Sequence, residues 1–242
     1  MNRKFLTGSA LKWFALITMF IDHIGAVLIP SLYSKGMGDE YIDWEIIYQI
    51  FRTVGRLSFP IFCFLLVEGY QHTSNKWKYL GRLVVFAFVS EVCFDWAIYN
   101  SLFYTGKQNI FFELALGILL MIGTDFLEKK FQNLYLQSVS IVSIWFAGML
   151  VARLLELDYG MYGILSIGIL YLFRRIPVFQ IFGGALSFYW ELPAPLAFFI
   201  VWFYNGKKGK QYKYFYYIFY PLHLVLLGFV RWLISCWEIG LF

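Results

Sequence analysis

The stretch that decides the fold is residues 10–30, ALKWFALITMFIDHIGAVLIP, which is long and apolar enough to cross a membrane. A membrane helix needs about 20 mainly apolar residues. Similar stretches recur along the chain of 242 residues, of which 60% are hydrophobic and 14% are charged. Soluble domains carry about 25% charged residues. This composition therefore excludes a soluble enzyme, a disordered regulator and a nucleic-acid-binding module, and it predicts a polytopic integral membrane protein.

The predicted fold class is all-α, a polytopic membrane helical bundle of about nine transmembrane helices in a single domain over residues 1–242. The apolar runs are too long for barrel strands and lack their alternation of polar and apolar residues. Pro177, Pro193 and Pro195 interrupt the region 160–206, so the number of spans there stays open. The predicted spans are about 10–30, 46–70, 79–99, 109–125, 135–153, 160–173, 177–190, 194–206 and 214–236.

The distribution of Lys and Arg predicts that the N-terminus lies in the cytoplasm. Basic residues near the ends of spans favour the inner side of a membrane. With the N-terminus inside, most Lys and Arg fall on that side, and the last span ends outside. The loop after the first span is acidic, with Asp39, Glu40, Asp43 and Glu45, and falls outside.

Two basic loops, residues 72–82 and 205–213, are predicted on the inner side. Their charges suit the headgroups of anionic membrane lipids, and they equally suit the phosphates of coenzyme A. The net charge of +5 comes from such short clusters, so no nucleic-acid partner is expected. The three Cys lie in apolar stretches without a CxxC pair, so neither a metal site nor a disulfide framework is predicted.

Ionisable residues inside the predicted spans are costly, at about 2.5–3.5 kcal/mol each near the centre of a helix. Two pairs of like charge have the i,i+4 spacing that puts them on one helix face. These pairs are Arg52 and Arg56 in the second span, and Glu91 and Asp95 in the third. We expect the two faces to pair with each other, beside Asp22 and His23. The alternative is a purely structural network that orients the helices.

His23 is the best candidate for chemistry among these groups. A lone buried His is usually a satisfied core residue. His23 instead follows Asp22, lies near the expected middle of the membrane and precedes a flexible Gly25. This setting is typical of a general base held by a charged partner. Pro60 is expected to kink the second span, and His223 is expected either to reach the inner membrane surface or to join a site that faces the cytoplasm.

Several blocks of the sequence resemble one known family over nearly the whole chain. They include IDHIG at 21–25, FPIFCFLLVEG at 59–69, QNIFF at 108–112 and FYPLHL at 219–224. These blocks resemble the TraX family, whose namesake is the conjugation-plasmid protein linked to N-terminal acetylation of F-type pilin. The first span is also distantly similar to the transmembrane acyltransferases, in which ten positions separate a basic residue from a His. Lys12 and His23 have that spacing.

The resemblance implies an acetyltransferase of the bacterial cytoplasmic (inner) membrane, with His23 as the catalytic residue and acetyl-CoA entering from the cytoplasm. Its acceptor is an unidentified amine, peptide, glycan or hydroxyl, and its oligomeric state stays open. The predicted catalytic residues are His23, Asp22, Arg56, Glu91 and Asp95. The predicted donor-binding residues are Lys12, His72, Lys76, Lys78, Arg82, Tyr220 and His223. The alternatives are a proton-coupled transporter or channel, and a structural membrane partner for a secreted peptide.

Overall fold

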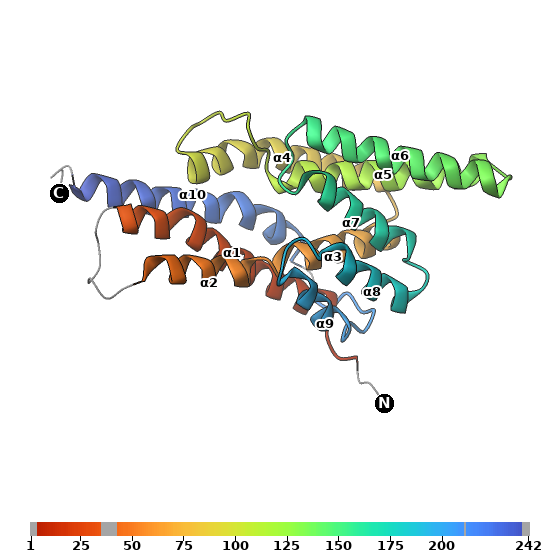
Figure 1. Ribbon diagram of the computed structural model, residues 1–242, viewed down its shortest axis with the longest axis horizontal. Helices are drawn as coiled ribbons and strands as arrows, with labels where there is room; N and C mark the ends of the chain where they lie inside the picture. Colours follow the sequence, from red (N-terminus) through yellow and green to blue (C-terminus); the bar gives the residue numbers. More distant parts are fainter. Residues whose placement is uncertain (1–3, 35–42, 211, 239–242) are drawn as a thin grey trace. The chain divides into compact units, whose positions relative to one another are not determined.

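The computed structural model describes residues 4–34, 43–210 and 212–238, and these residues form helices joined by short loops (Figure 1). The predicted all-α class is confirmed, with isolated bridges only at Leu6–Tyr204 and Gln108–Leu157 in the described part. The helices are α1 (Gly8–Ser34), α2 (Trp44–Gly55), α3 (Ser58–His72), α4 (Lys76–Tyr99), α5 (Ile110–Lys130), α6 (Leu134–Leu154), α7 (Gly160–Leu172), α8 (Pro177–Ser187), the short 3₁₀-helix η1 (Ala194–Leu196), α9 (Ala197–Val201) and α10 (Lys213–Glu238).

Five of the described helical segments are long and apolar enough to cross a membrane. They are α1, the pair α2–α3 over Trp44–His72, α5, α6, and Tyr214–Cys236 of α10. Large apolar side chains on these helices face outward, as on α6, where Leu134 is 75% and Leu154 is 81% exposed. Apolar surface on this scale needs a cover other than water. The structure therefore indicates a multi-pass membrane protein.

The short helices correct the predicted spans between 160 and 206. In place of a helix over 194–206 the chain forms η1 with 3 residues and α9 with 5. Helices α7 and α8 have 13 and 11 residues, which is at most about 20 Å at 1.5 Å per residue. The hydrocarbon core is about 30 Å thick. Pro177 starts α8, and Pro193 and Pro195 lie at η1, so each proline limits a helix instead of lying inside a span.

Helix α4 matches the predicted third span in length, with 24 residues. It is not among the five apolar segments, because it carries charges at both ends, from Lys76 to Asp95. A total of about nine spans and a cytoplasmic N-terminus stay predictions. The acidic residues Asp39 and Glu40, which served to predict the orientation, lie outside the described residues.

The predicted kink at Pro60 takes the form of a break. Helix α2 ends at Gly55 and α3 begins at Ser58. Pro60 has no N–H, so the carbonyl of Arg56, four residues earlier, has no helical donor. The backbone tightens at that point, where the N–H of Leu57 donates to the carbonyl of Val54 at 3.3 Å.

The chain forms two compact units, and the prediction of a single domain stays a prediction. Unit 1 contains the residues up to 61, residues 89–104 and the residues from 191 onward. Unit 2 contains residues 62–88 and 105–190. Helices α3 and α4 each contribute to both units, and the two units are described separately below.

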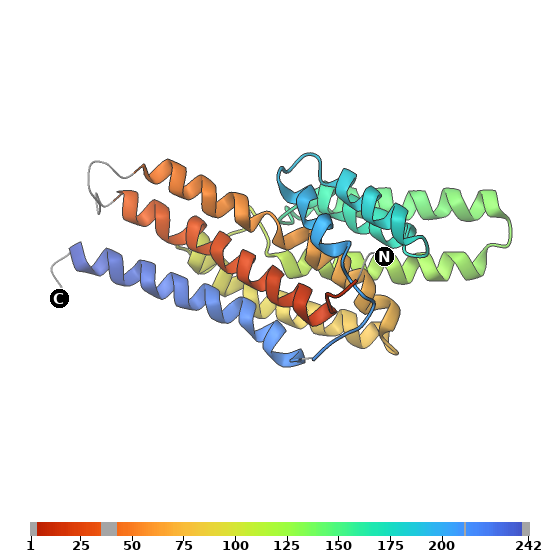
Figure 2. The same ribbon diagram turned by 90° about the horizontal axis from the view of Figure 1, so that it is seen from below.

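In unit 1, α1 lies between α2 and α10, as Figure 2 shows. Helices α1 and α10 run in the same direction, as predicted for the first and last spans. Gly25 and Gly55 bring α1 and α2 close together. A Cβ on Gly25 would lie 2.6 Å from the Cβ of Phe51, and one on Gly55 would lie 2.0 Å from Oδ1 of Asp22. The role of Gly25 is therefore close packing, where the sequence suggested flexibility.

In unit 2, α5 packs against α6 and α7, and α7 packs against α8. Trp145 of α6 donates its indole N–H to the hydroxyl of Thr124 of α5 at 3.0 Å, and both residues are buried. Leu120 of α5 packs directly against Gly148 of α6. A Cβ added to Gly148 would lie 2.4 Å from Cδ1 of Leu120. Small residues at such contacts let helices approach closely where no water drives them together.

We predict that Gly55→Ala destabilises the protein by about 1–3 kcal/mol, the usual cost of an overpacked contact. The added methyl group would displace Asp22, whose Cβ is 2.2 Å from the new atom and cannot move without its helix. A thermal unfolding curve of the protein in detergent measures the effect as a lower midpoint. The matched control is Gly81→Ala on α4, where no heavy atom lies within 4 Å of the added Cβ. Equal midpoints for the two variants would contradict the close packing of α1 and α2.

Candidate active site

The candidate active site lies where α1 meets α10 in unit 1. Nδ1 of His23 and Nε2 of His223 are 2.9 Å apart, and the two ring centroids are 4.9 Å apart. Phe20 contacts the His223 ring edge-on at 6.0 Å, and Tyr220 contacts the His23 ring at 5.9 Å. His223 is 4% exposed, whereas His23 is half-buried. The two imidazoles therefore form a hydrogen-bonded pair where α1 contacts α10.

The hydrogen bonds around the two rings assign their protons. A backbone carbonyl only accepts, so Nδ1 of His223 carries the hydrogen that it donates to the carbonyl of Phe219 at 2.8 Å. In a neutral ring Nε2 of His223 is then an acceptor. It accepts from Nδ1 of His23. In a neutral His23 ring, Nε2 then carries no hydrogen, which is the form that a general base needs.

His223 is buried within unit 1. The residue lies about 15 Å from the start of α10, given ten residues at 1.5 Å each. Its ring is buried and hydrogen-bonded on both nitrogens. A side chain that reaches the membrane surface would be exposed. His223 is instead the direct partner of His23.

Asp22 lies on the other side of α1 and faces α2. Its Oδ2 accepts from Nη1 of Arg52 at 2.5 Å. The ring of His23 is close enough to Arg52 for an electrostatic interaction. A carboxylate was expected to orient His23, but the side chain hydrogen-bonded to its Nδ1 is His223. Adjacent residues on a helix point about 100° apart, so Asp22 and His23 serve different neighbours.

Both Arg have carboxylate partners other than the expected Glu91 and Asp95. Arg52 donates to Asp22, and Arg56 donates to Glu191. Asp95 is buried and accepts the backbone N–H of Tyr104 at 2.8 Å, so it holds the turn after α4. Glu91 lies half-buried on α4. The i,i+4 spacing correctly predicted a shared face, but spacing within one helix does not identify the partner.

Lys12 lies on the same side of α1 as His23. Eleven residues rotate a helix by about three full turns, leaving the two side chains about 20° apart, and separate them by roughly 16 Å. The ammonium of Lys12 lies 4.9 Å from the centre of the Tyr216 ring on α10. The start of α1 also bonds to the basic loop, where the N–H of Ser9 donates to the carbonyl of Lys208 at 2.9 Å. The contact between α1 and α10, which we call the seam, thus runs from this basic end to the imidazole pair.

The predicted donor-binding residues fall into two sets. Lys12, Tyr220 and His223 lie with His23 in unit 1. The other four residues, His72, Lys76, Lys78 and Arg82, belong to unit 2. His72 is exposed and its Nδ1 bonds to the carbonyl of Glu68 at 2.8 Å, and Lys76 forms an ion pair with Asp125.

Three features escaped the sequence reasoning. The first is the ion pair of Arg56 with Glu191, which lies 135 positions away and carries no local signal. The second is the proximity of Arg52 to His23. The third is a polar cluster in unit 2, where Asp125 accepts from Tyr70 at 2.7 Å, from Tyr171 and from Lys76. The sequence offered one sign of this cluster, because Asp125 is a charged residue near the end of an apolar run.

Comparisons with known proteins find related sequences over nearly the whole chain. The family model described as "TraX protein" matches residues 7–231. A curated protein of Dichelobacter nodosus, named "Probable fimbrial assembly protein FimC, serogroup H1", is 31% identical over 241 residues. The match covers 90% of this chain and 92% of that protein. No solved structure matches.

We predict that His23 exists as the tautomer with its hydrogen on Nδ1. Nitrogen-15 NMR of the protein with labelled His measures this, because a protonated and a bare imidazole nitrogen differ strongly in chemical shift. The ring of His223 should show the same tautomer, and His223→Ala should remove the restriction on His23. His72 serves as the reference, since it is exposed and contacts only backbone through its Nδ1. A hydrogen on Nε2 of His23 would contradict the assignment.

Proposed function

This chain belongs to the TraX family, and we propose that it is a membrane acetyltransferase in which Nε2 of His23 is the general base. The observation that carries the proposal is the hydrogen bond between His23 and His223, which leaves Nε2 of the neutral His23 ring without a hydrogen. A lone pair with a fixed direction suits proton removal.

The proposed reaction transfers an acetyl group from acetyl-CoA to an amine or a hydroxyl. Nε2 of His23 removes a proton as the acceptor attacks the carbonyl carbon of the thioester. The carbon–sulfur bond then breaks, and the thiolate leaves and takes the proton from the imidazolium. His223 acts as a positioning residue, because it holds Nδ1 of His23 and touches neither substrate. The backbone carbonyl of Phe219 in turn orients His223.

Arg52 is the proposed stabiliser of the negative charge that develops on the thioester oxygen. Arg56, another predicted catalytic residue, forms an ion pair with Glu191, and Arg52 forms one with Asp22. Arg52 is preferred because it is the cation whose charge acts on the ring of His23. Its ion pair with Asp22 holds the guanidinium in place. Fixed donors near a developing charge are a large contribution to catalysis.

Acetyl-CoA fits the seam between α1 and α10 in its length and its charge. The basic end of α1, with Lys12 beside Lys208, suits the phosphates. The distance of roughly 16 Å along the helix to His23 is comparable to a pantetheine arm. We propose a cytoplasmic entry for the donor, in the inner membrane of a bacterium.

The proposed acceptor is the N-terminal amine of a pilin-type peptide. The support is the relative named as a probable fimbrial assembly protein, which aligns over 90% of this chain. A peptide amine needs a base to remove its proton during transfer, which is the role proposed for His23. A glycan hydroxyl would need the same base, so the choice between acceptors is experimental.

A proton-coupled transporter is the second candidate, because each unit holds a buried carboxyl oxygen without a hydrogen-bond partner. These are Oε1 of Glu113 and Oδ1 of Asp95, on residues that are 0% and 1% exposed. Buried acids of this kind occur in proton pathways. Proton or substrate flux in proteoliposomes without any acetyl donor would favour this function over acetyl transfer.

We predict that His23→Ala lowers kcat for acetyl transfer by about 10²–10⁴-fold, the usual contribution of a general base. The assay follows labelled acetyl groups from acetyl-CoA to a pilin N-terminal peptide. His223→Ala should lower kcat by about 10–100-fold with little change in KM, as expected for a group that orients a catalytic His. The control is Leu222→Ala, at a position that is 61% exposed beside His223. Full activity of the His23 variant would overturn the proposed function.

We predict that Lys12→Gln raises KM for acetyl-CoA roughly 10-fold, since one hydrogen bond to a charged group contributes about 1.5–3 kcal/mol. Its kcat should change little, because Lys12 lies far from the reacting atoms. S-acetyl-pantetheine lacks the nucleotide phosphates, so wild type and variant should have equal KM for it. Lys129→Gln at the end of α5 is the matched control. An equal rise in KM for acetyl-CoA and for S-acetyl-pantetheine in the Lys12 variant would contradict a contact between Lys12 and the phosphates.

A further inference from the structure

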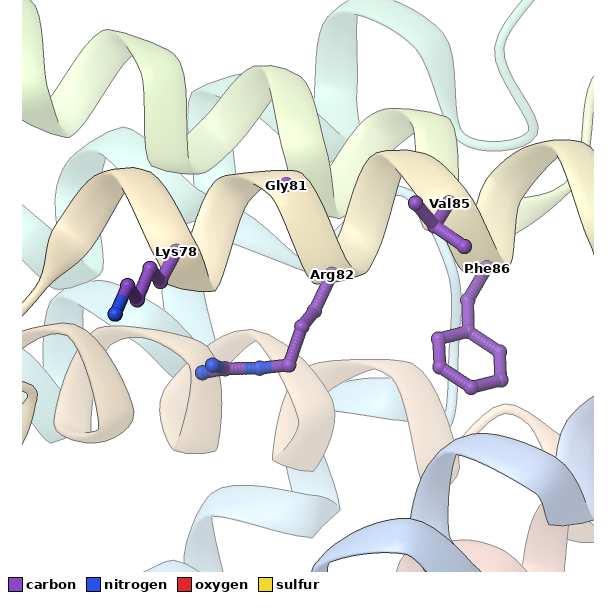
Figure 3. A pocket seen from close by; sticks show the side chains of 5 residues that line it. All are labelled: Lys78, Gly81, Arg82, Val85 and Phe86. Atoms are coloured by element: carbon purple, nitrogen blue, oxygen red, sulfur yellow. The ribbon is translucent and has the colours of Figure 1, made fainter.

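The groove on the first half of α4 is unused by the proposed reaction. It has a volume of about 470 Å³ and is lined by Lys78, Gly81, Arg82, Val85 and Phe86, all within unit 2 (Figure 3). Lys78, Arg82 and Phe86 follow each other at spacings of four residues and form one stripe of the helix. Gly81 and Val85 form the neighbouring stripe. Because Gly81 has no side chain, and nothing lies within 4 Å of the position of its Cβ, the groove is open there.

The two cations of the groove attract an anion. In the described residues, neither Lys78 nor Arg82 forms a recorded ion pair with a carboxylate. Nε of Arg82 is buried and has no hydrogen-bond partner, while the guanidinium lies 5.6 Å from the centre of the Tyr79 ring. Two like charges one turn apart repel each other. A phosphate between them would relieve this repulsion and accept from Arg82.

The other end of the groove is apolar. Val85 is 59% exposed, and Phe86 lies beside it and contacts the ring of Phe111 at 6.1 Å. Eight residues separate Lys78 from Phe86, which is about 12 Å along the helix. Trp77, 64% exposed, lies next to Lys78 at the start of α4. Exposed Trp side chains gather at the level of lipid headgroups.

We propose that this groove binds an acidic phospholipid, with the phosphate at Lys78 and Arg82 and an acyl chain along Val85 and Phe86. The order of charged and apolar residues along α4 matches the order of headgroup and hydrocarbon in a lipid. Coenzyme A has the same phosphate chemistry, but its pantetheine arm is polar and would face the apolar end. The inference does not depend on the proposed acetyltransferase function.

The test measures thermal unfolding of the purified full chain in detergent while phosphatidylglycerol is added. Binding to the folded state should raise the midpoint by roughly 5 °C at saturation. Phosphatidylcholine with the same acyl chains should have no such effect. The double variant Lys78→Gln/Arg82→Gln should lose the shift. Gly81→Leu should lose it too, because the side chain fills the groove while both cations remain.

Two controls separate this site from general attraction of basic residues to lipid. Lys129→Gln/Lys130→Gln removes two charges at the end of α5 and should keep the full shift. Native mass spectrometry should find phosphatidylglycerol retained on wild type and lost from Gly81→Leu. This measurement tests the site even if the double variant fails to fold. An equal shift with phosphatidylcholine, or loss of the shift in the α5 control, would overturn the proposal. Tighter binding of coenzyme A than of phosphatidylglycerol would overturn it as well.

Discussion

The arrangement of unit 1 depends on how α1 satisfies its polar side chains in an apolar setting. Three of them point to different partners, with Asp22 bonded to Arg52 of α2, His23 bonded to His223 of α10, and Lys12 over a Tyr ring of α10. Burying an ionisable group among apolar helices costs several kcal/mol of free energy unless the group is paired with a polar or charged partner. These contacts therefore determine which helices lie next to α1 and at what height along it. Gly55 supports them because only a residue without a side chain leaves room for Asp22.

The proposed chemistry follows from the same contacts. A His that is merely buried has no fixed tautomer, and its two nitrogens are interchangeable in function. Here a chain of hydrogen bonds begins at the carbonyl of Phe219 and ends at Nδ1 of His23. The carbonyl determines the proton of His223, and His223 determines that of His23. The carbonyl of Phe219 thus determines, through His223, which nitrogen of His23 carries no hydrogen. His223 therefore contributes to the proposed reaction without touching a substrate.

The fold was predictable to the extent that it depends on length and hydrophobicity. The all-α class and the long apolar helices follow from runs such as residues 10–30, and the break near Pro60 follows from its missing N–H. The helices α7 and α8 begin at the predicted residues and end one and three residues before the predicted ends. The predicted helix over 194–206 was wrong, because the segment is as apolar as a span but Pro193 and Pro195 limit it to η1 and α9. The role of Gly25 was also hidden, since its neighbour Phe51 lies on another helix.

The sequence by itself determined that this is a membrane protein of helices, that ionisable residues lie inside them, and that His23 stands out among these residues. It also determined which charges share a face, because the periodicity of a helix is a local property. Only the tertiary structure decided which faces meet. Arg52 binds Asp22, Arg56 binds Glu191 and His23 binds His223, across 30, 135 and 200 positions. Such partners are chosen by the packing of whole helices, and no local pattern of residues encodes that packing.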